Sequence, residues 1–331
     1  MRMDGKELQV AVLALIIGAA GMIFGVVAVS TSLSQTTEVI EGEDGADGED
    51  GEDLTRYGTV YYCSSGSEVQ DAIDSIGTGD GTIIIVQDII LSATIDIDQG
   101  GNLIIEGIHS TTIHIGGNWA AFDISDASGC ILRDLNIDAT DVGKYRNIIE
   151  VNESNNNYVE IFNVHIEGGV NGIGFRIYSE NVLIENCFVN GTYQAIELES
   201  TCQNVKIKDN HLHDIDAILL WLDGSNIVVE SNYLSNPTRK GTLIYDSSSS
   251  NSSIFNNRIN AYNSTGIFIF NSENNLYSGN YIHSFAFTTF ARFGIFSTSG
   301  TTNASITNNV INGFIGVDDY GLFFKHFSFS T

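Results

Sequence analysis

The stretch "NVLIENCFV" at residues 181–189 is one copy of a motif that recurs through the second half of the chain. Later copies read "NVKIKDNHL" (204–212), "NIVVESNYL" (226–234), "NSSIFNNRI" (251–259) and "ASITNNVI" (304–311). The shared pattern is apolar-x-apolar-x-x-Asn-x-apolar, with Cys187 in the Asn position of the copy at 181–189. A pattern that returns about every 22 to 29 residues is typical of repeat proteins, in which each repeat is one structural unit.

Each repeat also contains a second apolar segment that begins with a small residue, such as "GIGF" (172–175), "AIEL" (195–198) and "GIFI" (266–269). Alternating apolar residues, β-branched side chains, and Asn or Gly between the segments indicate two or three short strands per repeat. Such repeats stack into a parallel β-solenoid. We therefore predict an all-β solenoid whose coils cover residues 109–325.

The recurring asparagine defines one column of the predicted solenoid. An asparagine that returns in every coil can bond its amide to the equivalent residue above and below it. We predict a structural role for this column, as an amide ladder within a narrow turn, rather than a catalytic one. Its members are Asn210, Asn232, Asn257, Asn280 and Asn309, and Leu135, Val164 and Cys187 hold the same position in earlier coils.

The segment "SEVQDAIDSIGTGDGTIIIV" (67–86) begins as an amphipathic helix and ends as a buried strand. Val69, Ala72, Ile73 and Ile76 fall on one face of that helix. The open end of a solenoid exposes unpaired strand edges and core side chains, so a helix there serves as a lid. Residues 56–108 are predicted to form this amino-terminal cap and the first coils.

Residues 60–325 resemble the pectin-lyase-like family of right-handed parallel β-helices, whose members commonly begin with an AID…GDGTI segment like the one above. The resemblance implies a right-handed parallel β-helix with a short capping helix. Pectate lyases, polygalacturonases, phage tailspikes and adhesins all share this fold, so the fold alone does not select an activity.

The amino terminus contains a long apolar segment, Val10–Val29, of 20 uncharged residues. Such a length suits one transmembrane helix. Arg2 and Lys6 precede it, and no further Lys or Arg occurs until Arg56, which favours an inner amino terminus and an outer carboxyl-terminal body. We predict a leader at 1–9 and a single-pass membrane protein on a cell or virion surface. A signal peptide and a pilin-like leader are the alternatives.

The segment at 30–55 contains "EGEDGADGEDGED" (41–53), in which glycine recurs at every third position. It is predicted to be a solvated acidic stalk, and four triplets without proline do not by themselves form a stable collagen helix. Residues 326–331 are predicted to be a carboxyl-terminal tail.

Composition excludes some partners. The chain has 331 residues and a net charge of −27, which disfavours binding to nucleic-acid phosphates. The four cysteines have neither paired-ligand spacing nor an evident disulfide framework, so no structural zinc is indicated. Predicted export fits five Asn-x-Ser/Thr triplets, although an Asn-rich chain also produces them by chance. They begin at Asn152, Asn190, Asn251, Asn263 and Asn303.

Catalytic motifs of the pectin-lyase-like family are mostly absent. Gly-His-Gly, Arg-Ile-Lys and Asn-Thr-Asp do not occur, and no aspartate cluster lies in register with an arginine. The remaining candidates for a metal or acid–base patch are His211, His213, Asp214 and Asp216, which are otherwise solvated turn residues. No cofactor is predicted, with calcium left open.

Two outward stripes carry the functional predictions. The first is a column of flat side chains on which a sugar polymer could stack, or which could pack on one another for stability: His165, Phe188, His211, Tyr233, Arg258 and Tyr281. The second is an apolar row on the following strand: Leu219, Trp221, Leu243, Tyr245, Phe268, Phe270, Phe296 and Phe323. We predict that self-association covers this row, and the tail at 323–331 and the loops at 283–293 and 312–320 are the alternatives. The opposite pleat would instead expose Ile218, Thr242, Ile267, Ile295 and Leu322.

These observations together predict a surface β-helix with a structural or adhesive role that contacts glycans and forms a homo-oligomer, of which a trimer is one form. A polysaccharide lyase or glycoside hydrolase is the first alternative. A virion spike or receptor-binding protein is the second.

Overall fold

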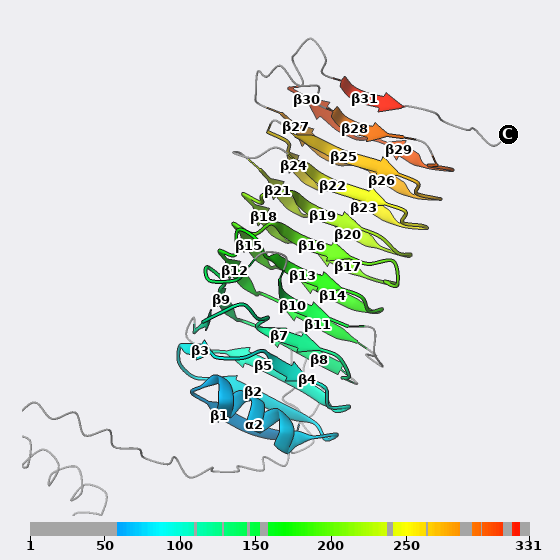
Figure 1. Ribbon diagram of the computed structural model, residues 1–331. Coiled ribbons are helices and arrows are strands. Elements are labelled where there is room, and N and C mark those ends of the chain that lie inside the picture. The colour runs from blue at the N-terminus through cyan, green and yellow to red at the C-terminus, as the bar shows by residue number, and fades with distance from the viewer. Residues whose placement is uncertain are drawn as a thin grey trace, which may run out of the picture. The chain divides into compact units, whose positions relative to one another are not determined.

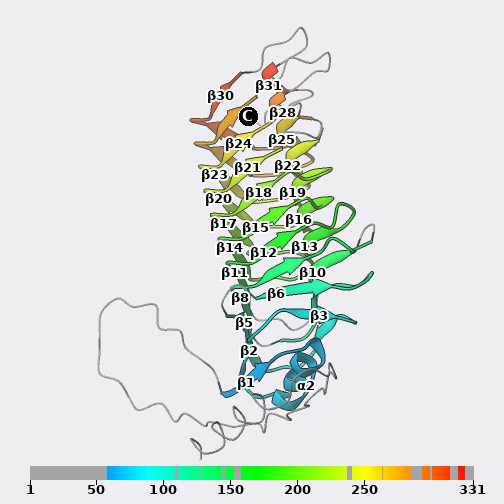
Figure 2. The same ribbon diagram turned by 90° about the vertical axis from the view of Figure 1, so that its left-hand side faces the viewer.

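The computed structural model describes residues 58–324, except 109–110, 128, 144–145, 153–157, 237–240, 263, 285–292, 299 and 314–319. In this part the chain forms a stack of coils, each of which contributes one strand to each of three parallel sheets (Figures 1 and 2). The predicted parallel β-helix is confirmed.

The described strands of each sheet pair in parallel, and each pairs with the equivalent strand of the coils before and after it. Sheet A contains β1 (Thr59–Cys63), β2 (Gly81–Ile85), β5 (Asn102–Gly107), β8 (Gly129–Arg133), β11 (Val159–Phe162), β14 (Val182–Glu185), β17 (Lys206–Lys208), β20 (Val228–Glu230), β23 (Ser253–Phe255), β26 (Leu276–Ser278) and β29 (Ser305–Thr307). Sheet B contains β3 (Ile89–Leu91), β6 (Thr112–Ile115), β9 (Asn136–Asp138), β12 (His165–Glu167), β15 (Phe188–Asn190), β18 (His211–His213), β21 (Tyr233–Ser235), β24 (Arg258–Asn260), β27 (Tyr281–His283) and β30 (Val310–Asn312). Sheet C contains β4 (Ile95–Ile97), β7 (Phe122–Ile124), β10 (Asn147–Val151), β13 (Ile173–Ile177), β16 (Gln194–Leu198), β19 (Ile218–Leu222), β22 (Thr242–Ser247), β25 (Thr265–Phe270), β28 (Phe293–Ser297) and β31 (Tyr320–Phe324).

The core lies inside the coils. In a typical sheet B strand the central residue points inward, as Ile166, Val189 and Leu212 do, and each of these is 0% exposed. Because side chains alternate along a strand, the first and third residues of the same strands point outward. Sheet B therefore presents two parallel columns of side chains to solvent.

The corner between sheets A and B is a single residue in the left-handed backbone region. Asp134, Asn163 and Asn186 occupy it with φ of 56°, 52° and 54°. Asparagine and aspartate adopt this conformation more readily than other residues with a side chain, which explains why they recur at the corner. The chain turns sharply there, and the next residue enters the solenoid interior.

The five predicted asparagines form a continuous amide ladder at that interior position. The Nδ2 of Asn210 donates to Oδ1 of Asn232 at 3.0 Å, and the same oxygen accepts the Asn210 backbone N–H at 2.9 Å. The pattern repeats from Asn232 to Asn257, to Asn280 and to Asn309. Each amide also donates to a backbone carbonyl of sheet A, as Asn232 does to Ile207 at 2.9 Å. The ladder thus satisfies backbone groups at a turn that has no sheet partner for them.

Helix α2 (Gly66–Ile76) covers the amino-terminal end of the coils. Ser65 caps it by accepting the N–H of Glu68, and Val69, Ala72 and Ile73 are buried against the first strands. Gln70 bonds twice to Asp96 of the edge strand β4: its Nε2 donates to the carbonyl at 3.0 Å, and its Oε1 accepts the N–H at 2.9 Å. The side chain of Gln70 therefore satisfies the backbone N–H and carbonyl of Asp96, which a free strand edge would leave without a protein partner.

A buried acid lies in the core between sheets C and A. Asp246 is 0% exposed, and its carboxylate accepts hydrogen bonds from Ser249, Ser272, Asn275 and Tyr277. Burial, followed by the nearby Asp246 charge, raises the pKa of the Tyr277 hydroxyl well above its usual value. The phenol therefore remains a donor at all physiological pH values.

The predicted localisation needs correction. In the described part of the chain, no helix is both long and apolar enough to cross a membrane, which contradicts the prediction of a single-pass membrane protein. The segment on which that prediction depends, residues 10–29, lies outside the described residues, as do the leader at 1–9, the acidic stalk at 30–55 and the tail at 326–331.

We expect Asn232→Leu to destabilise the solenoid by about 2–5 kcal/mol, because each buried polar group that it leaves without a partner costs about 1–3 kcal/mol. Urea unfolding followed by circular dichroism measures the change. The matched control is Asn171→Leu, at an exposed turn position, which is expected to shift stability by less than about 0.5 kcal/mol. Equal losses in the two variants would show that the ladder does not stabilise the coils.

The cysteines provide a second test of the interior. Cys130 and Cys187 are fully buried, and burial raises the pKa of each thiol to about 12. Because only the thiolate reacts with disulfide reagents, we expect no labelling of these thiols between pH 7 and 9 unless denaturant is added. Rapid labelling of the native protein, located by peptide mass spectrometry, would contradict the described packing.

Candidate functional site

The first outward column of sheet B is a continuous row of rings. Register places His165, Phe188, His211 and Tyr233 in successive coils. Their ring centroids are 4.5, 5.0 and 4.7 Å apart, and each pair meets edge to face. The guanidinium of Arg258 follows at 5.4 Å from the Tyr233 ring, and Tyr281 extends the column with 40% exposure. The sequence therefore identified which residues share this column, which we call the ring column.

The second outward column of sheet B is polar, and we call it the polar column. From β6 to β30 it contains His114, Asp138, Glu167, Asn190, His213, Ser235, Asn260, His283 and Asn312. Asn260 donates to the hydroxyl of Tyr233 at 2.8 Å, and Asn312 donates to that of Tyr281 at 3.3 Å. Hydrogen bonds between the columns hold the rings in place and leave a strip of mixed rings and amides along the solenoid axis.

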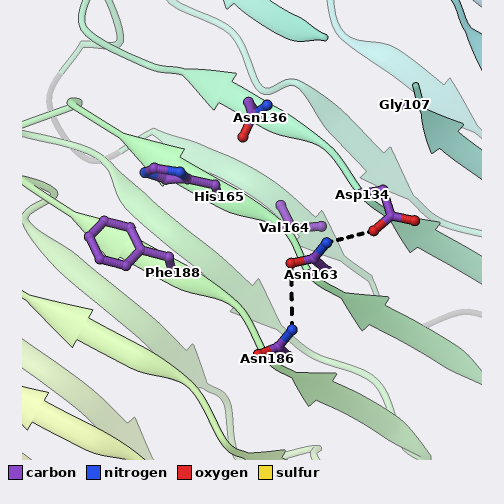
Figure 3. Close-up of a pocket in the computed structure, with 8 residues that line it drawn as sticks. All are labelled: Gly107, Asp134, Asn136, Asn163, Val164, His165, Asn186 and Phe188. Atoms are coloured by element: carbon purple, nitrogen blue, oxygen red, sulfur yellow. Dashed lines mark hydrogen bonds between the residues drawn. The ribbon is translucent and has the colours of Figure 1, made fainter. Parts of the chain in front are cut away.

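A groove with a volume of about 580 Å³ lies where this strip meets the corner with sheet A. Figure 3 shows the residues that line it: Gly107, Asp134, Asn136, Asn163, Val164, His165, Asn186 and Phe188. Asn186 donates to Asn163 at 3.5 Å, and Asn163 donates to Asp134 at 2.6 Å. The groove thus combines one carboxylate, three amides and two rings, a lining suited to the hydroxyls and flat faces of a sugar.

His211 and His213 lie on β18 with ring centroids 6.0 Å apart, close to the predicted arrangement. Burial, and then the charge of His213, lowers the pKa of His211, so its neutral form is favoured. Asp214 and Asp216 follow on the corner after the strand, where their backbone N–H groups donate to Ser235 and Thr192. Among the described residues, no three His, Cys, Asp or Glu side chains are grouped closely enough to hold a metal ion.

Not all of the residues predicted to form a self-association face point outward, and self-association itself stays a prediction. Trp221, Tyr245, Phe268 and Phe296 do share one outward column of sheet C, with centroid distances of 4.8, 5.2 and 4.9 Å. Phe270 is 39% exposed two residues beyond, whereas the side chain of Phe323 lies outside the described part. Leu219 and Leu243 are 0% exposed and belong to the core.

The error has a local cause. Leu219 and Leu220 are both fully buried, so the alternation of side chains is interrupted near the start of the strand. The corresponding position in β25 is Gly266, where a side chain would point at Ile282 of sheet B. The opposite pleat is also wrong for Ile267 and Ile295, which are 0% exposed. A count that assumes strict alternation backward from Trp221 therefore places Leu219 on the outer face, although this side chain is buried.

The same outward column of sheet C is charged in its first half, a feature that sequence reasoning missed. Register aligns Asp96, Asp123, Glu150, Arg176 and Glu197 in successive coils. Arg176 bonds Glu199 at 2.5 Å and lies 3.9 Å from Glu197. Burial raises the pKa of Glu197, against the effect of Arg176. An alignment of the second strand could have found this column, since the residues recur one coil apart.

The predicted glycosylation sites lie in different surroundings. Asn251 and Asn303 are exposed corner residues with φ of 51° for each, whereas Asn152 is half-buried and donates to Asp123 at 2.6 Å. Asn190 belongs to the polar column, and Asn263 lies outside the described residues. Modification of these asparagines stays a prediction.

The family model described as "Right handed beta helix region" matches residues 64–248 and 147–311. The chain belongs to this family. The predicted resemblance to pectin-lyase-like β-helices is therefore confirmed at the level of the fold. No curated protein matches the chain by sequence.

Solved structures support the same architecture. The enzymatically active domain of tailspike protein 2 from bacteriophage CBA120 is 16% identical, with a TM-score of 0.61 over 78% of this chain and 43% of the tailspike chain. DFA-IIIase from Arthrobacter chlorophenolicus A6 in complex with GF2 is 14% identical, with a TM-score of 0.56 over 78% of this chain and 88% of that chain. At such identities the likeness concerns the fold alone.

Proposed function

We propose that the outer face of sheet B binds a linear polysaccharide. The observation that carries the proposal is that His165 and Phe188 belong both to the ring column and to the groove of about 580 Å³. A polymer that enters the groove would therefore meet rings on successive coils, which repeat about every 4.8 Å along the sheet. Such a face gives a structural or adhesive protein many weak contacts with one glycan chain.

The ring column also stabilises the fold, because edge-to-face aromatic pairs contribute about 0.5–1.5 kcal/mol each. The two roles are separable by comparison with sheet C. Tyr245 lies between two aromatic neighbours there, at 4.8 and 5.2 Å, much as Phe188 lies between His165 and His211. Removing either ring should cost similar stability, whereas only Phe188 lines the groove.

We expect Phe188→Ala to weaken polysaccharide binding by about tenfold or more, since truncating a central aromatic contact typically costs at least about 1.4 kcal/mol. Affinity gel electrophoresis against a panel of acidic and neutral polysaccharides measures the effect. Tyr245→Ala is the matched control and should bind as the unchanged protein does. Equal weakening in both variants, or no retardation by any polymer, would contradict the proposal.

A second candidate function, cleavage of a glycosidic bond, is favoured by Glu197. Its raised pKa suits a general acid, and Glu150 lies two coils away in the same outward column. Two strand spacings correspond to about 9.6 Å, near the upper separation of the two carboxyls in inverting glycosidases. Trp221, next in the column after Glu197, offers a ring for the sugar.

We expect Glu197→Gln to abolish any release of reducing ends, measured on the same polysaccharide panel. A general acid works only while protonated. Because the pKa of Glu197 is raised from its ordinary value of 4.5, its carboxyl stays protonated to a higher pH than an exposed glutamate does. Activity should therefore decline as pH rises through the pKa of Glu197. Asp209→Asn, at a sheet A to B corner, is the control for loss of one carboxylate. Undiminished activity of Glu197→Gln would exclude this assignment.

A further inference from the structure

Histidines are concentrated on one face of the solenoid. The structure describes five of them, and all five point outward from sheet B: His165 and His211 in the ring column, and His114, His213 and His283 in the polar column. In the described strands, no histidine lies on sheet A or sheet C. Imidazole is the side chain whose ordinary pKa, about 6.5, brings a change of charge near neutral pH.

The fixed charges of the same face are few. The outward positions of the described sheet B strands contain one positive charge, Arg258, and two negative charges, Asp138 and Glu167. With neutral imidazoles the face carries about −1, and with the three histidines of the polar column protonated it carries about +2. The face therefore changes sign when these imidazoles are protonated, within a chain whose net charge is −27.

The other two sheets do not offer such a change. On sheet A the bases are paired with acids: Arg133 with Glu106 at 2.5 Å, Lys206 with Glu230 at 2.8 Å, and Lys208 with Glu185 at 2.8 Å. The charged column of sheet C begins with Asp96, Asp123 and Glu150. Of the described strands, only those of sheet B can present net positive charge to an anion.

The imidazoles of the two columns have different neighbours. In the polar column, His114 Nδ1 lies 3.0 Å from Asp138, His213 Nδ1 lies 3.4 Å from Asn190, and His283 contacts Asn312. Their partners on the other neighbouring strand are Ile90 for His114, Ser235 for His213 and Asn260 for His283. Asp214 and Asp216 follow His213 in the chain.

The ring column behaves differently. His165 lies between Asn136 and Phe188 in register, with Glu167 two residues on, and His211 lies between Phe188 and Tyr233, with His213 two residues on. The Nε2 atoms of both rings are buried, without a hydrogen-bond partner in the described residues. Burial, and then the charge of His213, lowers the pKa of His211, which disfavours its protonated form. Among the described residues, none of the three polar-column histidines has a buried ring nitrogen without a partner, so these are the imidazoles that we assign to the ligand.

We propose that sheet B is an acid-activated binding face for anionic polysaccharides, whose carboxylate or sulfate groups pair with protonated His114, His213 and His283 while the sugar rings lie on the ring column. The proposal rests on the proposed function of this face and adds the charge class of its ligand and the pH dependence of binding. Sugar carboxylates, with pKa values near 4, remain ionised at pH 5.5 and can form such pairs.

The test uses the full chain and three probes at constant ionic strength: polygalacturonate, dextran sulfate and neutral dextran. Binding to the anionic probes should be about tenfold or more tighter at pH 5.5 than at pH 7.5, without a comparable gain for dextran. Gain with only one anionic probe identifies the group that is recognised. Equal affinities at the two pH values, or an equal gain for neutral dextran, would overturn the proposal while leaving polysaccharide binding intact.

Variants distinguish the effect of histidine protonation from the effect of losing negative charge elsewhere in the chain at low pH. The combined variant His114→Gln, His213→Gln and His283→Gln should lose most of the tenfold gain, and its ring column is unchanged. The control Lys206→Gln with Lys208→Gln, on sheet A, should keep the gain. A gain that survives the histidine substitutions overturns the proposal.

Proton uptake provides a measurement on the unchanged protein. Calorimetric titration with polygalacturonate at pH 6.5, in two buffers of different ionisation enthalpy, should show net uptake of protons on binding. Binding without proton uptake contradicts the proposal, even if the histidine variant does not fold. Failure of every probe to bind at either pH would instead contradict the proposed function.

Discussion

The buried amide ladder from Asn210 to Asn309 fixes how successive coils stack. Each rung joins one side-chain oxygen to the backbone N–H and the amide of the coil before it, at 2.9–3.0 Å. A slip of one residue between coils would break both bonds and move every inward side chain to the surface. The ladder and the left-handed corner residue before it thus enforce one register in the coils from Cys187 to Asn309.

A fixed register turns the sequence of each strand into columns on the surface. On sheet B the result is a ring column beside a polar column, tied together by bonds such as Asn260 to Tyr233 at 2.8 Å. On sheet C the same principle gives a column that changes from acids to aromatic rings between Glu197 and Trp221. Each candidate functional surface of this molecule is therefore a column of side chains from successive coils, and one substitution changes the side chain of one coil.

The sequence predicted sheet B better than sheet C for a physical reason. In sheet B the strands after β6 are three residues long. They begin two residues after the corner residue, as His165 follows Asn163, so counting from that residue gives the correct pleat. In sheet C the strand contains two consecutive buried residues, as at Leu219 and Leu220, and the count fails there. The charged half of sheet C was missed because the outward row was compared only from Leu219 onward, and Asp96 to Glu197 lie in earlier coils.

The sequence by itself determined the architecture of this protein: the period of the repeat, the amide ladder, the capping helix and the membership of the ring column. These features depend on local spacing and on residue types that recur at fixed intervals. Only the tertiary structure decided which face of sheet C is exposed, where the groove opens, and that the described histidines share one face. Those properties depend on the stacking of residues 20 or more positions apart, which a local pattern does not fix.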